Sequence, residues 1–241
     1  MIKKINKYFD KKIVIGVSSG VDSMVLFDLL KHHDIVVAHI NHNIRPESDY
    51  EQTYLKDYCL KANVPFETTT LTYSDSEKEE NFQLIARNKR YEFYKNVLKK
   101  YDADLLALAH HGDDLVETIL MSISRGTSLR GLIGFGEESQ SGIVEIIRPL
   151  IKYAKQDLID YANENEIIYF DDESNKSDRY TRNRYRNHLL PFLKKESNNI
   201  HQKYLSMSED LNDIYDYLMD EVNNFIDSER SIANYQKLHK A

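Results

Sequence analysis

The fold of this 241-residue chain is decided by the stretch Ile13-Val14-Ile15-Gly16-Val17-Ser18-Ser19-Gly20-Val21-Asp22-Ser23. Residues 13–17 form an uninterrupted apolar run, as expected of a strand buried on both faces. Residues 21–32 then carry apolar side chains at helical spacing, and a second apolar run follows at residues 35–40. The three segments predict two parallel strands joined by a crossover helix.

The rest of the chain repeats this alternation. Further strands are predicted at residues 66–71, 105–109 and 143–147, and further helices at about 80–101, 113–124 and 153–165. We therefore expect a mainly parallel open α/β sheet with helices on both faces, formed by residues 1–195. Residues 196–241 predict a helical extension that begins a second, truncated domain. Residues 126–142 hold five of the eight glycines and predict a mobile connection.

The composition is that of an ordinary globular protein, with 41% hydrophobic and 29% charged residues. No apolar stretch approaches the ~18 residues of a membrane span, and no leader segment is visible, so we expect a cytoplasmic protein. A single cysteine, Cys59, excludes an internal disulfide and a multi-cysteine metal centre. Eight acidic residues between Tyr204 and Glu229 account for the net charge of −7, which therefore neither supports nor excludes RNA binding.

Small and hydroxylated residues between the first strand and the first helix predict a phosphate-binding loop. Backbone N–H groups can approach an anion closely there, and the helix N-terminus adds partial positive charge. The predicted ATP ligands are Ser18, Ser19, Gly20, Val21, Asp22 and Ser23. Neither GxxxxGK[ST] nor GxGxxG is present, and Asp22 beside phosphate implies a bridging Mg²⁺. The alternative is that these residues only cap the helix.

This loop resembles the SGGxDS signature of the N-type ATP pyrophosphatases, the PP-loop family. Those enzymes have an adenine nucleotide α-hydrolase-like fold and split ATP between its α and β phosphates to adenylate a substrate. Ser19 replaces the usual glycine of the signature. A serine fits there only if the backbone keeps an ordinary φ.

Further segments resemble the tRNA(Ile)-lysidine synthetase family in order and spacing. They are HINHNIRP (39–46), NFQLIARNKRY (81–91), AHHGDD (109–114) with Glu117 and Arg125-Gly126, RPL (148–150), DESN (172–175) and Arg182-Asn183. The resemblance implies ATP-dependent attachment of free L-lysine to C2 of the wobble cytidine in the CAU anticodon of tRNA(Ile). An adenylated cytidine would be the intermediate, and AMP and pyrophosphate would be released.

The family resemblance also assigns roles to residues that follow the fourth strand. It implies that Asp114 and Glu117 handle lysine and metal, and that His110 acts beside the activated base. Asp114 and Glu117 are three residues apart and share a helix face. Asp22 and Asp114 are the tentative Mg²⁺ ligands, and a carboxylate or His110 would take the proton of the amine. Helix capping by Asp113, or a zinc site that includes His111, are the alternatives.

Other basic residues have two interpretations each. Arg87 is a functional cation for phosphate or the reacting base, or forms a helix-surface salt bridge. His39 flanks the adenine or caps its strand. A cluster of arginines, interleaved with tyrosines, would suit an anticodon loop or would form a solvated helix face; its members are Arg179, Arg182, Arg184 and Arg186.

Three rival functions remain open at this stage, and so does a homodimer. A tRNA thiolase of the same fold would generally need more cysteines than Cys59. A non-catalytic nucleotide-binding module would bind ATP without releasing pyrophosphate. An amidotransferase-type synthetase would need an ammonia-producing domain that the sequence does not contain.

Overall fold

The computed structural model describes residues 2, 5, 7–43, 47–73, 82–170, 177–178 and 180–227. Within them lies a six-stranded sheet with the order β3-β2-β1-β4-β6-β5. The strands are β1 (Ile13–Val17), β2 (Ile35–Asn41), β3 (Phe66–Thr70), β4 (Leu105–Ala107), β5 (Glu138–Ser141) and β6 (Val144–Ile147). All neighbours pair in parallel except β5 and β6, so the mainly parallel sheet is confirmed.

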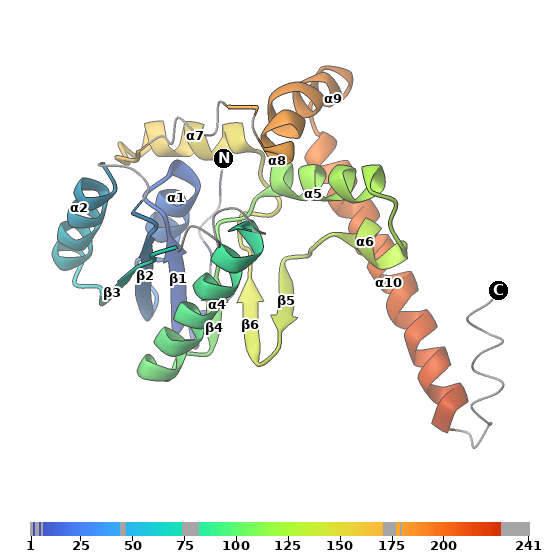
Figure 1. Ribbon diagram of the computed structural model, residues 1–241, viewed down its shortest axis with the longest axis horizontal. Helices are drawn as coiled ribbons and strands as arrows, with labels where there is room; N and C mark the ends of the chain where they lie inside the picture. The colour runs from blue at the N-terminus through green and yellow to red at the C-terminus, as the bar shows by residue number, and fades with distance from the viewer. Residues whose placement is uncertain are drawn as a thin grey trace.

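Helices cover both faces of the sheet (Figure 1). On one face lie α1 (Val21–Leu30), α2 (Ser48–Lys61) and α7 (Lys155–Glu164), packed on inward side chains that include Ile13 and Ile15. On the other lies α4 (Phe82–Tyr101), packed on Val14 and its neighbours. Because successive strand residues point to opposite faces and both faces are covered, the central strands read as continuous apolar runs.

The order of the strands creates a crevice at one edge of the sheet. The chain runs from β1 outward through β2 and β3, and then returns to place β4 on the other side of β1. Ligands bind at such a switch point, outside the carboxyl ends of the strands. The predicted phosphate loop follows β1, and residues 108–111 follow β4. The topology therefore brings the two predicted parts of the site together.

Residues 126–142, predicted to be a mobile connection, partly form regular structure. This segment contains α6 (Leu129–Ile133) and β5, which pairs antiparallel with β6. Gly134 ends α6 with a φ of +68°, and Gly142 has a φ of +63° in the turn between β5 and β6. These glycines occur because tight turns need left-handed backbone, which glycine adopts at little cost. The sixth strand begins at Val144, while Ile143 is 88% exposed outside it.

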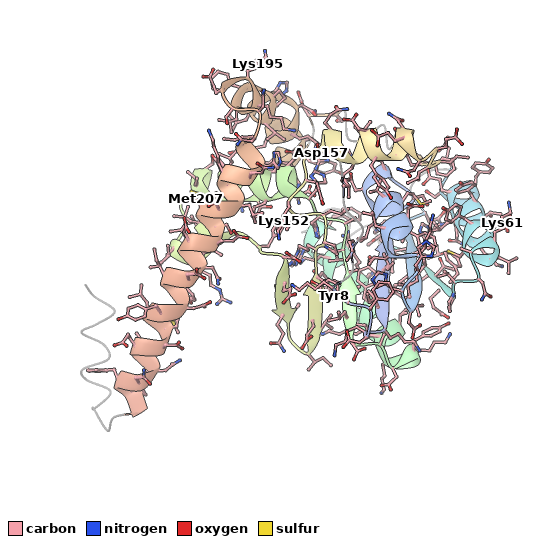
Figure 2. The ribbon with its side chains drawn as sticks, turned by 180° about the vertical axis from the view of Figure 1, so that it is seen from behind. Tyr8, Lys61, Lys152, Asp157, Lys195 and Met207 are labelled. Atoms are coloured by element: carbon pink, nitrogen blue, oxygen red, sulfur yellow. The ribbon has the colours of Figure 1, made fainter. Side chains whose placement is uncertain are left out.

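The carboxyl-terminal part of the described chain is helical. It consists of α8 (Thr181–Arg184), a π-helical turn η2 (Tyr185–Leu189), α9 (Leu190–Glu196) and α10 (Ile200–Asp227). Leu205 of α10 packs with Leu115 and Ile119 of α5 (Gly112–Ser124). Beyond this contact α10 runs away from the sheet, as Figure 2 shows past Met207. Among the described residues no helix combines the length and apolar character needed to span a membrane.

Candidate active site

The loop between β1 and α1 is closed by its own hydroxyl groups. Ser23 Oγ donates a hydrogen bond to the Gly20 carbonyl (2.9 Å) and accepts one from the Ser18 N–H (3.1 Å). Gly20 is the N-cap of α1, so the amide groups of the first helical turn lack intrahelical acceptors. These N–H groups and the positive end of the helix dipole form an anion-binding surface.

Ser19 departs from the expectation that a serine in this loop keeps an ordinary φ. Its φ is +67°, in the left-handed region, and its side chain is fully buried. Its carbonyl accepts a hydrogen bond from the Phe170 N–H (3.0 Å), which ties the loop to the segment after α7. A residue with a Cβ adopts this backbone at a cost of about 1–2 kcal/mol. The loop therefore retains the backbone shape that favours glycine, at some cost in stability.

A cavity of about 640 Å³ opens beside this loop, at the carboxyl ends of β1, β2 and β4. Its size suits a nucleotide. The lining includes Ser18, Asp22, Ser23, His39, His110 and Asp114. The His39 ring nitrogen Nδ1 lies 2.9 Å from the Val17 carbonyl, and burial lowers the pKa of His39. His39 thus bonds a strand end and lines the cavity, so its two predicted roles are compatible.

Asp22 is paired with a lysine that sequence analysis missed. Lys155 Nζ donates to Asp22 Oδ1 at 2.7 Å, and the Lys155 backbone N–H donates to Asp113 Oδ2 at 3.0 Å. Lys155 begins α7 and is separated from Asp22 by 133 residues, so no local motif links them. The one available signal was the lack of a lysine in the phosphate loop itself.

The residues around Asp22 fit Mg²⁺ only as part of a nucleotide complex. Among the described residues no group of three or more His, Cys, Asp or Glu side chains could hold a metal ion. Magnesium is commonly held by one or two carboxylates together with substrate phosphates and water, so Asp22 alone is a suitable protein ligand. The zinc site considered for His110, His111 and Asp114 gains no support from this geometry.

The predicted lysine ligands lie in a cluster of four charged side chains, Asp114, Glu117, Arg182 and Arg186, which we call the carboxylate–arginine cluster. Glu117 is fully buried; its Oε1 accepts from Arg186 Nε (2.7 Å) and its Oε2 from Arg182 Nε (2.8 Å). Asp114 Oδ1 accepts from Nη2 of Arg182 (3.2 Å) and of Arg186 (3.0 Å). The two arginines therefore turn inward and do not form a solvated helix face.

This pairing changes what Asp114 can do. Burial by itself would raise the pKa of Asp114, but His111 and Arg182 hold that pKa well below its usual range. Asp114 Oδ2 also accepts the His111 backbone N–H (3.0 Å) in the cap of α5. Because both oxygens already accept hydrogen bonds, the tentative assignment of Asp114 to Mg²⁺ is not supported, whereas that of Asp22 stays a prediction.

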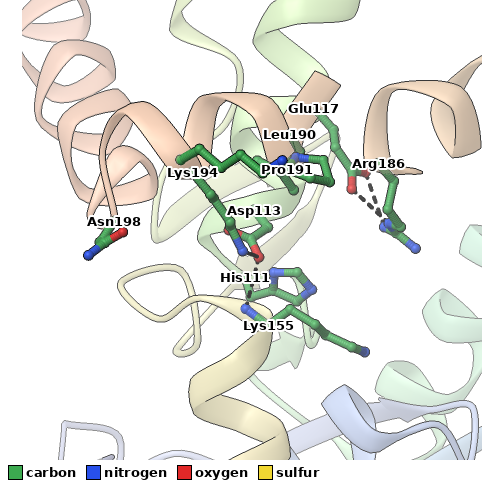
Figure 3. A pocket seen from close by; sticks show the side chains of 10 residues that line it. His111, Asp113, Glu117, Lys155, Arg186, Leu190, Pro191, Lys194 and Asn198 are labelled. Carbon is green, nitrogen blue, oxygen red and sulfur yellow. Dashed lines mark hydrogen bonds and ion pairs between the residues drawn. The ribbon is translucent and has the colours of Figure 1, made fainter. Parts of the chain in front are cut away.

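A second cavity of about 490 Å³ lies next to the carboxylate–arginine cluster (Figure 3). Glu117 and Arg186 line it, and Asp114 lines the first cavity, so the cluster borders both. The lining is mixed in charge and partly apolar; it also includes Asp113, Lys155, Leu190, Pro191, Lys194 and Lys195. Lys194 Nζ pairs with Asp113 Oδ2 at 2.5 Å, a contact that sequence analysis did not anticipate.

His110 lies where its neutral form is favoured. Burial lowers the pKa of His110 to about 4, against a smaller opposing effect of Asp114. The His110 ring centroid is 5.5 Å from the Phe135 ring centroid. The Arg148 guanidinium lies over the same Phe135 ring, 5.0 Å from its centroid. At neutral pH His110 is therefore uncharged and can accept a hydrogen bond.

Two of the remaining predicted residues are placed less favourably. Arg87 is exposed, lies over the Tyr91 ring at 4.8 Å and lines neither cavity, whereas Arg90 on the same helix lines the first. Arg184 is exposed and donates to the Asp178 carbonyl (3.0 Å). Arg179 and the motif residues 44–46, 81 and 172–175 lie outside the described residues.

Comparison of the sequence with known proteins identifies the family of this chain. Residues 1–193 match the family model described as a PP-loop domain. The chain belongs to the PP-loop family. It is 39% identical over 233 residues to the tRNA(Ile)-lysidine synthase of Bacillus subtilis, covering 92% of this chain and 49% of that protein. It is 38% identical over 224 residues to the enzyme of the same name from Streptococcus mutans, covering 87% and 50%. This PP-loop chain thus spans about half the length of the curated relatives it matches.

A solved structure supports the fold. The U34-tRNA thiolase from Methanococcus maripaludis, described with its [4Fe-4S] cluster, aligns with a TM-score of 0.71, 18% identity, and coverage of 87% of this chain and 75% of the thiolase. At this identity the likeness concerns the fold alone. In this PP-loop protein the single cysteine, Cys59, is fully buried on α2, and burial raises its pKa to about 12. Such a thiol is a poor nucleophile and metal ligand.

Proposed function

We propose that this PP-loop protein adenylates the wobble cytidine in the CAU anticodon of tRNA(Ile) and transfers free L-lysine to C2 of that base, forming lysidine. The observation that carries the proposal is the adjacency of the phosphate loop and the carboxylate–arginine cluster at one edge of the sheet. The loop suits the pyrophosphate of ATP. The cluster has carboxylates that can bind an ammonium group of lysine and guanidinium groups that can bind its carboxylate. The relatives named above support the same chemistry.

In the first step, cytidine O2 attacks the α phosphorus of ATP. The bond from that phosphorus to the bridging oxygen breaks, and pyrophosphate leaves with the electron pair. The N–H groups at the start of α1 are preorganised for the charge that develops on the leaving group. Mg²⁺, held by Asp22 and the phosphates, would neutralise further charge.

In the second step, lysine would exchange partners with the carboxylate–arginine cluster. Its ammonium would bind Glu117 or Asp114, and its α-carboxylate would take an arginine released from them. The carboxylate raises the pKa of this ammonium and the neighbouring guanidinium lowers it. The ε-amine attacks C2 once the ε-ammonium has given its proton to the carboxylate or to water. AMP then departs. His110 is neutral at pH 7 and is the candidate to accept the proton that the new C–N bond makes acidic.

The RNA contacts of the proposal rest on fewer arginines than the sequence suggested. Arg182 and Arg186 are engaged by carboxylates, so among the described members of the predicted arginine set the exposed one is Arg184, which we propose as a phosphate contact. Substitution Arg184→Ala should lower the slope of log affinity against log salt by about one unit. We propose that the protein works in the cytoplasm, where tRNA, ATP and lysine meet; a homodimer remains a prediction.

The rival functions have less support. Sulfur transfer by a thiolase would have to use a buried cysteine of raised pKa, or cysteines from elsewhere. A non-catalytic module would require Ser19 to spoil the phosphate loop, but the φ of +67° at Ser19 keeps the backbone shape that favours glycine. That module would bind ATP without releasing pyrophosphate.

Pyrophosphate release separates these functions. With MgATP and tRNA(Ile), we expect one burst of pyrophosphate without lysine and continuous turnover with lysine. Asp22→Asn should abolish the burst, whereas Asp34→Asn, an exposed carboxylate away from the cavity, should not. Glu117→Gln should spare the burst more than lysine transfer and raise the KM for lysine about 10- to 100-fold. Pyrophosphate release that ignores the RNA, or none at all, would contradict the proposal.

A further inference from the structure

The phosphate loop lacks the lysine that a GxxxxGK[ST] loop carries, but the fold brings an ammonium to the same place. Lys155 Nζ lies 2.7 Å from Asp22 Oδ1, at the start of α1. The base of the side chain is fixed, because the Lys155 N–H donates to Asp113 Oδ2 and because Leu158 and Ala162 of α7 share a core with α1. The rest of the side chain is 40% exposed and can move.

Lys155 pairs with one carboxylate oxygen of Asp22, Oδ1, and a cation bound at the same carboxylate would repel this ammonium. Mg²⁺ carries twice the charge of an ammonium and prefers carboxylate and phosphate oxygens, so in a nucleotide complex it would compete with Lys155 for Asp22. The ammonium of Lys155 would then be released beside the loop. Lys155 lines the second cavity, and its ammonium meets the first cavity at Asp22, which is part of that lining.

We propose that Lys155 is the phosphate-binding lysine of this site, supplied by α7 instead of by the loop. With MgATP bound, its ammonium leaves Asp22 and binds the β-phosphate oxygens of the departing pyrophosphate. As the bond from the α phosphorus breaks and the electron pair passes to the bridging oxygen, the ammonium donates hydrogen bonds to the growing charge. No proton has to be transferred. The inference deepens the proposed function, because it takes ATP as the substrate of the same cavity.

The alternative is that Lys155 only clamps α7 to α1 through Asp22. A partly exposed ion pair contributes little to stability, so Lys155→Ala should fold either way. The two roles differ in what they do to ligands. A clamp affects every ligand of the cavity alike, whereas a phosphate-binding ammonium distinguishes pyrophosphate from AMP.

Calorimetric titration of the whole chain with magnesium pyrophosphate and, separately, with AMP tests the inference. We expect Lys155→Ala to weaken pyrophosphate binding about 10- to 100-fold and to leave the AMP Kd unchanged. Lys155→Arg, which keeps a cation, should restore most of the affinity. Lys152→Ala removes an exposed lysine paired with Glu137 in the same segment, and should match the unmodified chain.

Equal pyrophosphate affinity in Lys155→Ala and the unmodified chain would overturn the inference, and so would equal weakening of both ligands. The proposed function is judged separately, by pyrophosphate release with tRNA(Ile). If that release is absent while the pyrophosphate-selective loss persists, Lys155 keeps its role and the choice of RNA substrate is wrong. If pyrophosphate release occurs with tRNA(Ile) and Lys155→Ala binds pyrophosphate normally, the proposed function stands and the role of Lys155 is wrong.

Discussion

Replacing Glu117 with glutamine should destabilise the protein by about 2–3 kcal/mol. The carboxylate is fully buried and accepts three hydrogen bonds, two from Arg186 (2.7 and 3.1 Å) and one from Arg182 (2.8 Å). Hydrogen bonds to charged groups contribute roughly 1.5–3 kcal/mol each, and breaking a buried ion pair costs 3–5 kcal/mol. The side chains of Arg182 and Arg186 are 39% and 35% exposed, so water replaces part of what they lose and the lower range applies.

A double-mutant cycle with Arg186→Gln isolates the pair. Urea unfolding at pH 7, followed by circular dichroism, should give a coupling free energy of about 1–2 kcal/mol between Glu117 and Arg186. Glu164→Gln removes an exposed carboxylate of α7 and should lie within about 0.5 kcal/mol of the unmodified chain. A coupling below about 0.5 kcal/mol, the range of independent sites, would refute the reasoning that the carboxylate–arginine cluster is a strong ion-pair network.

Three further predictions follow from single residues. Because the pKa of His110 falls to about 4 in the folded protein, the native state binds fewer protons than the unfolded state between pH 6.5 and 4. The contribution of His110 to the free energy of unfolding is therefore present above pH 6.5 and declines as the pH falls from 6.5 to 4. Unfolding of His110→Gln should lack this part of the pH dependence. A Cβ on Gly112 would lie 2.9 Å from the Ile151 carbonyl oxygen, so Gly112→Ala should lower the free energy of unfolding in urea by about 1–3 kcal/mol. Gly136→Ala is the control: its Cβ would lie 3.6 Å from the nearest atom, and the loss should be less than about 1 kcal/mol. Ser19→Gly should change the free energy of unfolding by between about 0 and +1 kcal/mol, because relief at φ +67° is partly offset by the entropy of glycine; a loss of 2 kcal/mol would mean that the hydroxyl is needed.

The fold could be predicted wherever apolar periodicity was long enough to read. The run at residues 13–17, the helix after it and the run at 35–40 each appear within a few residues of the predicted limits. The strand β5 could not be found in this way, because its sequence ESQS is polar and it exists through pairing with β6 at the edge of the sheet. Its neighbouring glycines marked turns, which sequence alone did not distinguish from a mobile segment.

The site could be predicted in its residue types but not in its pairings. Asp114 and Glu117 were identified through the family resemblance, and their three-residue spacing, which is a local property, predicted a shared helix face. Their partner Arg182 lies 65 residues from Glu117, and Lys155 lies 133 residues from Asp22. Only the three-dimensional fold decides such contacts. From the sequence, Arg182 and Arg186 were therefore expected on an RNA-binding surface. In the structure they instead form ion pairs with the buried carboxylates of Asp114 and Glu117.

Transfer of a labelled α phosphate tests the central claim most directly. The chain, tRNA(Ile) and ATP labelled in its α phosphate are mixed with Mg²⁺ but without lysine, with the protein in excess over the tRNA. We predict that label becomes covalently attached to the RNA, with pyrophosphate released in equal amount, and that added lysine then discharges the label as AMP and leaves lysidine in the anticodon. Label that remains in ATP, appears as ADP, or stays on the RNA after lysine is added would contradict the account.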